Sequence, residues 1–378
     1  MEKSPTPTSN LETPSSSFDP KEVFREAQKN PAEFWQSNYS SIEQGFSRPA
    51  YVGRTDQAQV AIMVPSHNEN SGEKAGHLMA CLYALSQLRL SSADTLKVIV
   101  IGHNESAEDG TEALLKQLGE KVEYLAYDTP LRSFSYPLQV APCVLRSDEV
   151  TEVGIIDADT VVNPDWLQAN RTILAANDGV QAIACPRTYL DRNGEAVPYG
   201  TVKLALEQGT SLLQRLLPSS LSPAFATKLV SGNSYYRYDI LSSVMSELLG
   251  KAVTDGHIQH SIASQGGKIH LNPEAWAVSD GEKFIEARGV ALLRTLVMKV
   301  RRMLAPGLSD HIAFLEQELP SYFPDFATLV DKNADRLSRL KSEQRLQLLQ
   351  QLLSEYEAST QVQIQHDIAQ LKIQRANS

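Results

Sequence analysis

A short apolar run followed at once by two carboxylates places the strongest constraint on this chain. Val153 to Ile156 is apolar and of strand length, and Asp157 and Asp159 follow it with Ala158 between them. Such a run bounded by polar residues is typical of a buried strand. Carboxylates at the end of a buried strand are costly unless a positive group lies beside them. The segment therefore predicts a buried strand that ends in an acidic, cation-binding turn.

A helix is expected shortly after the acidic pair, because Asn163 and Pro164 read as a cap residue followed by a first-turn proline. In open α/β sheets, ligands bind in the crevice at the carboxyl ends of the strands. This order places Asp157 and Asp159 where a ligand and a divalent cation would be held. Two carboxylates one residue apart suit Mg²⁺ or Mn²⁺, which also take phosphate oxygens. The simpler interpretation is a surface loop with two solvated aspartates.

Strands and helices alternate along the middle of the chain. Apolar strand patterns occur over 60–64, 96–101 and 122–127, and leucines at helical spacing occur over 73–89. This alternation predicts an α/β fold with a Rossmann-like mixed, mostly parallel sheet and helices on both faces. The last hundred residues lack the alternation and are helical by pattern, so we expect a C-terminal helical region as well.

Four regions are expected from these patterns and from the local composition. They are a disordered Ser-, Thr- and Pro-rich tail over 1–20, an N-terminal helical brace over 21–57, the α/β domain over 58–285, and the C-terminal helical region over 286–378.

The bulk composition excludes several classes of protein. The 378-residue chain has a formal net charge of -10, which does not suit a nucleic-acid-binding face. Its three cysteines are far apart and form no CxxC pair, so neither a zinc site nor a disulfide framework is indicated. No apolar run approaches the length of a transmembrane segment, and the N-terminus lacks the apolar core of a secretory signal. We therefore expect a cytoplasmic protein.

Four blocks of the sequence, in order, resemble nucleotide-sugar glycosyltransferases of the GT-A fold, especially family 2. Val60-Ala-Ile-Met-Val-Pro-Ser-His-Asn-Glu69 resembles the family's opening strand, which ends in Pro-x-Tyr-Asn-Glu. Residues 98–111 are similar to the strand and acidic loop that hold the base and ribose. The third block is the acidic pair, and the fourth is Thr254-Asp255 with the residues that follow it to Gly266. The resemblance covers residues 58 to about 285.

The resemblance implies a metal-dependent hexosyltransferase that moves a sugar from a UDP- or GDP-sugar to an unknown acceptor hydroxyl. Asp159 and Asp157 would ligate Mg²⁺ or Mn²⁺, and Asp255 would be the catalytic base that takes the acceptor proton. The simpler interpretation of Asp255 is a helix cap. The nucleotide-sugar pocket would be lined by Pro65, His67, Glu69, His103, Arg132, Asp157 and Ala158.

Two departures from the family pattern keep alternatives open. His103 stands where the family has an aspartate, and Thr254 replaces the acidic partner of the base. A non-catalytic nucleotide-sugar-binding protein with a decayed site is therefore one alternative. Other residues, including Asp255-Gly256, are similar to the retaining GT-A enzymes that make mannosylglycerate or glucosylglycerate. A retaining enzyme of that kind is the second alternative, and it would need no base at Asp255.

The C-terminal region carries two further expectations about partners. Residues 286–304 are basic and amphipathic, which is compatible with peripheral contact to an anionic membrane. The interpretation that we favour is a helix packed on the main domain. The leucine-rich segment 337–356 has its apolar residues on one stripe, and it would form either an intramolecular bundle or a homo-oligomer contact.

Overall fold

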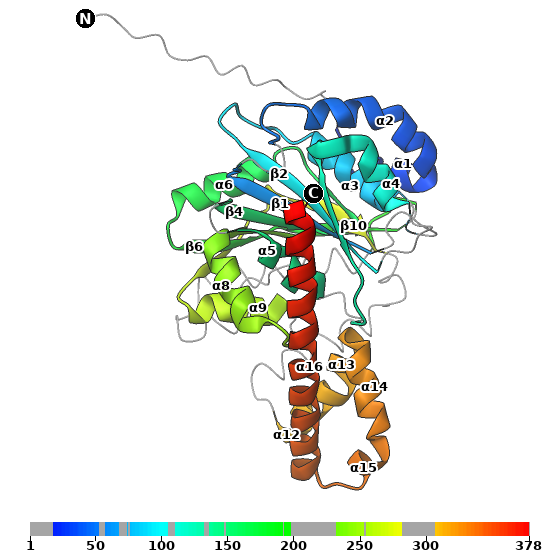
Figure 1. Ribbon diagram of the computed structural model, residues 1–378, viewed down its shortest axis with the longest axis vertical. Helices are drawn as coiled ribbons and strands as arrows, with labels where there is room; N and C mark the ends of the chain where they lie inside the picture. The colour runs from blue at the N-terminus through cyan, green and yellow to red at the C-terminus, as the bar shows by residue number, and fades with distance from the viewer. Residues whose placement is uncertain are drawn as a thin grey trace, which may run out of the picture.

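A mixed α/β body carries a helical region that projects from it (Figure 1). The computed structural model describes residues 18–52, 57–67, 74, 76–104, 110–131, 136–146, 149–191, 193–197, 232–252, 255–281 and 307–377. Two of the segments singled out above, the tail before residue 18 and the basic segment 286–304, lie outside these ranges.

A seven-stranded sheet in the order β3-β2-β1-β4-β8-β6-β9 forms the centre of the body. Its parallel half consists of β3 (Glu123–Tyr127), β2 (Leu96–His103), β1 (Val60–Ser66) and β4 (Glu152–Ile156). Its other half consists of β8 (Asn233–Arg237), antiparallel to both neighbours, then β6 (Val180–Ala184) and β9 (Lys268–Leu271), which pair in parallel. The prediction of a mixed, mostly parallel sheet is confirmed. Because β8 is antiparallel to both β4 and β6, these two strands run in the same direction. β6 therefore ends at the same edge as β1, β2 and β4.

A second, three-stranded sheet in the order β5-β10-β7 stands beside this carboxyl edge. Its strands are β5 (Thr160–Val162), β10 (Ala277–Asp280) and β7 (Arg187–Leu190). β5 begins one residue after Asp159, and β7 begins after the two residues that follow β6. The small sheet therefore collects the segments that leave the ends of β4 and β6.

Helices cover both faces of the main sheet, as the sequence predicted (Figure 1). Alternate residues of β1 feed two separate cores: Ile62 packs on one face and Met63 on the other, both fully buried. The Ile62 core includes residues of α1 (Pro20–Lys29), α2 (Pro31–Phe46), α3 (His77–Ser86), α4 (Thr111–Leu118) and α6 (Trp166–Ala176). The Met63 core includes residues of α5 (Tyr136–Val144), α8 (Tyr238–Leu248), α9 (Asp255–Ser264) and α16 (Ser342–Asn377).

The two N-terminal helices are started by caps and by first-turn prolines. The Asp19 side chain accepts a hydrogen bond from the Lys21 N–H, and the Asn30 side chain accepts one from the Glu33 N–H. α1 then contacts α3, β5 and β10, so it packs against the small sheet beside the carboxyl edge. α2 approaches α3 so closely that a Cβ on Gly45 would lie 2.4 Å from the Ser86 carbonyl oxygen.

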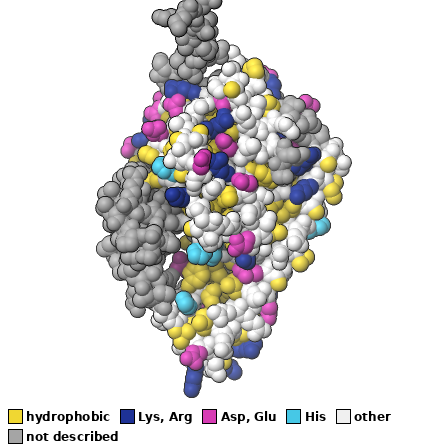
Figure 2. Space-filling view, turned by 90° about the vertical axis from the view of Figure 1, so that its left-hand side faces the viewer, with side chains coloured by type: hydrophobic (Ala, Val, Ile, Leu, Met, Phe, Trp, Pro, Cys, Tyr) yellow, Lys and Arg dark blue, Asp and Glu magenta, His cyan; other side chains and the backbone are white. Residues whose placement is uncertain are grey.

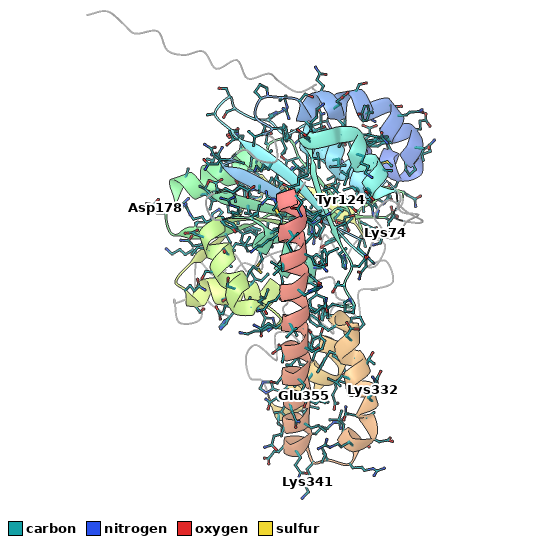
Figure 3. All side chains as sticks on the ribbon, viewed as in Figure 1. Lys74, Tyr124, Asp178, Lys332, Lys341 and Glu355 are labelled. Carbon is teal, nitrogen blue, oxygen red and sulfur yellow. The ribbon has the colours of Figure 1, made fainter. Side chains whose placement is uncertain are left out.

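The helical region is built on α16, which has 36 residues and is therefore about 54 Å long. Its first half packs with α12 (Leu308–Ala313) and α14 (Pro324–Lys332), with a π-helical turn (Phe314–Glu318), α13 (Leu319–Tyr322) and α15 (Ala334–Ser338) between or beside them. Lys341, just before α16, marks the tip farthest from the sheet (Figure 3). Hydrophobic side chains gather on one face of the lower half of the molecule (Figure 2).

The predicted leucine stripe packs within the chain. Leu349, Leu352 and Tyr356 are buried in the same core as Met63, and the Tyr356 hydroxyl hydrogen-bonds that of Tyr136 on α5. The described contacts therefore fit the intramolecular bundle, and an oligomer contact stays a prediction. Of the helices among the described residues, none is both long and apolar enough to cross a bilayer.

A buried ion network fixes the far end of α16 to the amino edge of the sheet. Arg375 donates to both Glu123 and Glu149, and Lys97 donates to Glu149 at 2.7 Å. The four side chains are between 3% and 10% exposed, and two positive charges balance two negative ones. Burial alone would raise the pKa of Glu149, but the hydrogen bonds from Arg375 and Lys97 lower it.

Removing one member of this network should strongly destabilise the protein. We expect Arg375→Met to lower the free energy of unfolding by about 3–5 kcal/mol, because it leaves buried carboxylates without their cation. Urea denaturation measures this. The control is Lys116→Met, which breaks an exposed pair with Glu112 and should change stability little. Equal losses in the two variants would contradict a structural role for the network.

The same network should make stability depend on acid. The pKa of Glu149 is lowered in the folded state, so its contribution is present above the unfolded pKa of about 4.3 and is lost as pH falls below it. We expect Glu149→Gln to be less stable than the wild type at pH 7. Its stability should also decline less between pH 5 and pH 3. Parallel pH profiles of unfolding for the two proteins would contradict this.

Candidate active site

The turn that carries the acidic pair is tied to both neighbouring strands. The Asp157 N–H donates to the Gly232 carbonyl at 2.9 Å, just before β8, and the Ala158 N–H donates to the Pro65 carbonyl at 3.3 Å, near the end of β1. The Thr160 N–H closes the turn by donating to the Asp157 carbonyl at 2.9 Å. The pair therefore stands at the carboxyl edge of the sheet, on a turn with a fixed backbone.

Gly232 leaves the space that the Asp157 carboxylate fills. Its φ of +74° is in the left-handed region, and a Cβ built on it would lie 1.8 Å from the Asp157 carboxyl carbon. Any side chain there would displace the carboxylate. Glycine is therefore required at this position on both conformational and steric grounds.

The positive group beside the acidic pair is an arginine from β7. Arg187 Nη1 donates to Asp157 Oδ2 at 2.9 Å, and it lies 3.5 Å from the Thr160 hydroxyl. The guanidinium carbon lies 5.4 Å from the centroid of the Tyr189 ring. The Arg187 side chain is 8% exposed and that of Asp157 35%. Burial acts to lower the pKa of Arg187, but Tyr189 and the two aspartates raise it by more. The pKa is therefore above its usual value, and the guanidinium stays charged.

Asp159 is held differently, by two buried hydroxyl groups. Its Oδ1 accepts from the Thr160 hydroxyl at 3.0 Å and from the Ser279 hydroxyl at 2.8 Å. Thr160 and Ser279 are directly paired in the β5–β10 ladder, so the small sheet sets both donors side by side. Among the described hydrogen bonds, the Asp157 carboxylate accepts from a cation, Arg187, and the Asp159 carboxylate accepts from two hydroxyl groups.

Two histidines meet at the ends of β1 and β2. His67 Nδ1 donates to the His103 carbonyl at 2.8 Å, and the two ring centroids are 4.6 Å apart. His103 Nδ1 lies 3.4 Å from the Ser66 carbonyl. Burial lowers the pKa of His103 to about 4, with a smaller contribution from His67, so this imidazole is neutral at pH 7. With Nδ1–H directed at a carbonyl, its Nε2 is a hydrogen-bond acceptor.

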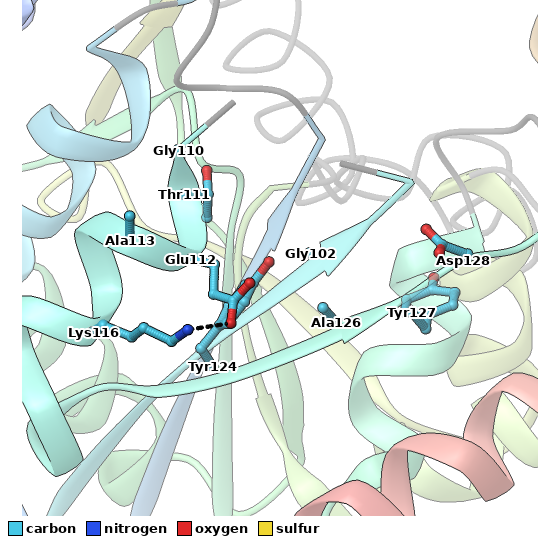
Figure 4. A pocket seen from close by; sticks show the side chains of 10 residues that line it. All are labelled: Gly102, Gly110, Thr111, Glu112, Ala113, Lys116, Tyr124, Ala126, Tyr127 and Asp128. Atoms are coloured by element: carbon cyan, nitrogen blue, oxygen red, sulfur yellow. Dashed lines mark ion pairs between the residues drawn. The ribbon is translucent and has the colours of Figure 1, made fainter. Parts of the chain in front are cut away.

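A cavity of about 350 Å³ opens between the ends of β2 and β3 and the start of α4 (Figure 4). Gly102 and Ala126 line it, and an ion pair of 2.7 Å between Glu112 and Lys116 lies at one side. Three residues that line it, Gly102, Gly110 and Thr111, belong to the block that the resemblance assigns to the base and ribose.

The structure brings most of the predicted site residues to one edge. Pro65 and Ala158 are hydrogen-bonded to each other, Asp157 and Asp159 flank Ala158, and His67 and His103 are in contact next to Pro65. Glu69 and Arg132 lie outside the described residues. Asp255 is the first residue of α9, and its side chain is likewise not described.

Four residues of the site were missed by the sequence analysis: Arg187, Ser279, Thr160 and Gly232. The sequence held a signal for Arg187, because it follows the end of β6 (Val180–Ala184) as Asp157 follows the end of β4. Ser279 gave no such signal, since its contact with Asp159 joins positions 120 residues apart.

The donor atoms fit a divalent cation at Asp159 better than at Asp157. Carboxylate oxygens suit Mg²⁺ or Mn²⁺, and metal ligands are commonly oriented by outer hydrogen bonds such as those from Thr160 and Ser279. Asp157 Oδ2 is already engaged by Arg187. Within the described ranges, no group of three or more His, Cys, Asp or Glu side chains is arranged to hold a metal ion. A cation here would need oxygens from a ligand or from water.

Comparison with known proteins gives distant structural likenesses. No protein-family model matches the chain, and no curated protein matches it in sequence. It is similar to the mannosyltransferase PcManGT from Pyrobaculum calidifontis in complex with GDP-Man and Mn²⁺, at 17% identity and a TM-score of 0.43, over 90% of this chain and 99% of that one. It is also similar to S. aureus TarS 1–349 in complex with UDP-GlcNAc, at 13% identity and a TM-score of 0.43, over 82% and 92%. At these values the similarity does not identify a function.

The fit of Gly232 against Asp157 can be tested with a matched glycine. Gly110 has nearly the same φ, +72°, but nothing lies within 4 Å of its added Cβ. We expect Gly110→Ala to cost roughly 1 kcal/mol from backbone strain alone. Gly232→Ala should cost about 2 kcal/mol more, because the carboxylate and its turn must move. Urea denaturation compares the two, and equal costs would mean that Asp157 does not depend on this contact.

Proposed function

We propose that this protein is a glycosyltransferase that moves a sugar from a nucleoside-diphosphate sugar to an acceptor hydroxyl. The observation that carries the proposal is the convergence of the first three sequence blocks at one sheet edge. Pro65 of the first block bonds Ala158 of the third, and His67 of the first bonds His103 of the second. Blocks that resemble one family in sequence order thus also lie in contact with one another, which supports a common site.

The position of the fourth block also supports a site at the carboxyl edge of the sheet. α9 leads through Gly266 and Gly267 into the start of β9, which is at the amino edge of the sheet. The other end of α9, where Asp255 stands, is therefore directed toward the carboxyl edge. In our proposal Asp255 takes the proton of the acceptor hydroxyl as that oxygen attacks the sugar.

Asp159 and His103 have proposed roles that their surroundings support. Asp159 would hold Mg²⁺ or Mn²⁺, which when bound offsets the charge of the departing diphosphate. His103 is neutral, and its Nε2 can accept a hydrogen bond from an N–H of the base, as the family's aspartate would. The replacement of aspartate by histidine therefore preserves an acceptor at this position. Both UDP- and GDP-sugars carry such an N–H, so both are candidate donors.

The two alternatives make different predictions about Asp255. In an inverting enzyme, Asp255→Asn should abolish transfer, whereas a retaining enzyme of the mannosylglycerate or glucosylglycerate synthase kind would keep most of it. A non-catalytic nucleotide-sugar-binding protein would bind the donor without turnover.

A thermal-shift panel of UDP-, GDP- and dTDP-sugars with Mn²⁺ identifies the donor, because a ligand that binds the folded state raises the melting temperature.

The role of Asp159 is the most direct test. With the donor that the panel selects, we expect slow Mn²⁺-dependent release of the nucleoside diphosphate by the wild type. Asp159→Asn should reduce that rate by about 10²–10³-fold, the size of effect seen when charge stabilisation is removed from a transition state. High-performance liquid chromatography of the nucleotide measures it.

The control for this test is Asp165→Asn, which removes an exposed carboxylate that pairs with Arg89. It should leave the rate unchanged. Both variants should keep the circular-dichroism spectrum of the wild type. An Asp159→Asn enzyme with full activity would rule out the proposed role of the acidic pair.

A further inference from the structure

Arg187 is held as firmly as the carboxylate that it pairs with. Its backbone is in β7, paired to Ala277 of β10, and its guanidinium lies over the Tyr189 ring while Nη1 contacts Asp157. On the other side, Gly232 and the turn fix Asp157. Arg187 is thus held by a strand and Asp157 by a turn, so the pair is part of the fixed structure at this edge of the sheet.

The pair changes the charge that a divalent cation would meet. Asp157 and Asp159 together contribute two negative charges, and Arg187 neutralises one of them within hydrogen-bonding distance. An arginine–carboxylate pair and a metal–carboxylate bond compete for the same oxygen. While Arg187 holds Asp157 Oδ2, Asp159, whose described hydrogen-bond donors are two neutral hydroxyl groups, is the better carboxylate of the pair for a cation.

Arg187 also has a donor that the described contacts do not use. Its Nε is buried and has no hydrogen-bond partner among the described residues. A buried donor of this kind is costly unless an acceptor reaches it. An oxygen of an anionic ligand would satisfy it, and the charge of the guanidinium would attract that ligand.

We propose that Arg187 is a positioning residue that divides the acidic pair: it occupies Asp157 as a resident cation, so that a divalent metal is held by Asp159 and the donor's own oxygens. The inference rests on the proposed function for the identity of the donor. It makes metal binding dependent on the donor. The ligand-free protein should then bind Mn²⁺ weakly, because a single carboxylate with water is a poor site.

The experiment measures Mn²⁺ binding to the ligand-free protein, from the electron paramagnetic resonance signal of free Mn²⁺. Arg187→Met releases Asp157, so we expect at least a tenfold gain in Mn²⁺ affinity over the wild type. The double variant Arg187→Met with Asp157→Asn should return to the wild-type affinity. Arg187→Lys keeps the charge but not the planar fork, so its gain should be smaller than that of Arg187→Met.

Unchanged or weaker Mn²⁺ binding by a folded Arg187→Met protein overturns the proposal. A gain that persists in the double variant also overturns it, because the gain would not come from Asp157. Should Arg187→Met fail to fold, Arg187→Gln alone and Arg187→Gln with Asp157→Asn decide in the same way. A gain in Mn²⁺ affinity in the single variant that is lost in the double variant supports the division of the pair, and any other result contradicts it.

The Mn²⁺ titration needs no nucleotide, so its outcome is separate from that of the proposed function. If no nucleoside-diphosphate sugar shifts the melting temperature of the wild type, the proposed function fails. The affinities of the Arg187 and Asp157 variants for Mn²⁺ still report whether the arginine occupies that carboxylate.

Discussion

The ion pair between Asp157 and Arg187 is the contact on which the geometry of the site depends. Two carboxylates one residue apart repel each other, and burial beside a sheet makes that repulsion larger than in water. Arg187 neutralises the charge of Asp157, and the hydroxyl groups of Thr160 and Ser279 donate hydrogen bonds to Asp159. The acidic turn can therefore have a fixed geometry and still carry a net negative charge. A turn with both properties can attract a cation.

The small sheet supplies the side chains that contact the two carboxylates. β5, β7 and β10 are short, and each carries one side chain to the acidic turn: Thr160, Arg187 and Ser279 respectively. Because β10 is hydrogen-bonded to both β5 and β7, the three side chains keep their spacing. α1 packs on the same sheet, so the N-terminal helices contribute to the site indirectly by supporting it.

The parts of the structure that could be predicted from the sequence are those set by local patterns. The apolar runs ending at Val64, Ile101 and Ile156 gave three central strands, and the rule about strand ends brought Asp157 and His103 to one edge. What local patterns do not contain is the partner of each polar side chain. Arg187 lies 30 residues from Asp157, and Arg375 lies 226 residues from Glu149. Such pairs are chosen by the packing of whole elements, so a positive group could be required beside the acidic pair while its identity stayed open.

α16 has a mechanical consequence for the whole molecule. Its hydrogen-bonded backbone runs unbroken from the tip near Lys341 to Arg375 at the amino edge of the sheet. A hinge between the helical region and the sheet would have to break that helix or pull Arg375 from its carboxylates. The helical region is therefore rigidly attached to the sheet. Any force applied at its tip is delivered to the starts of β2, β3 and β4, at the opposite edge from the acidic turn.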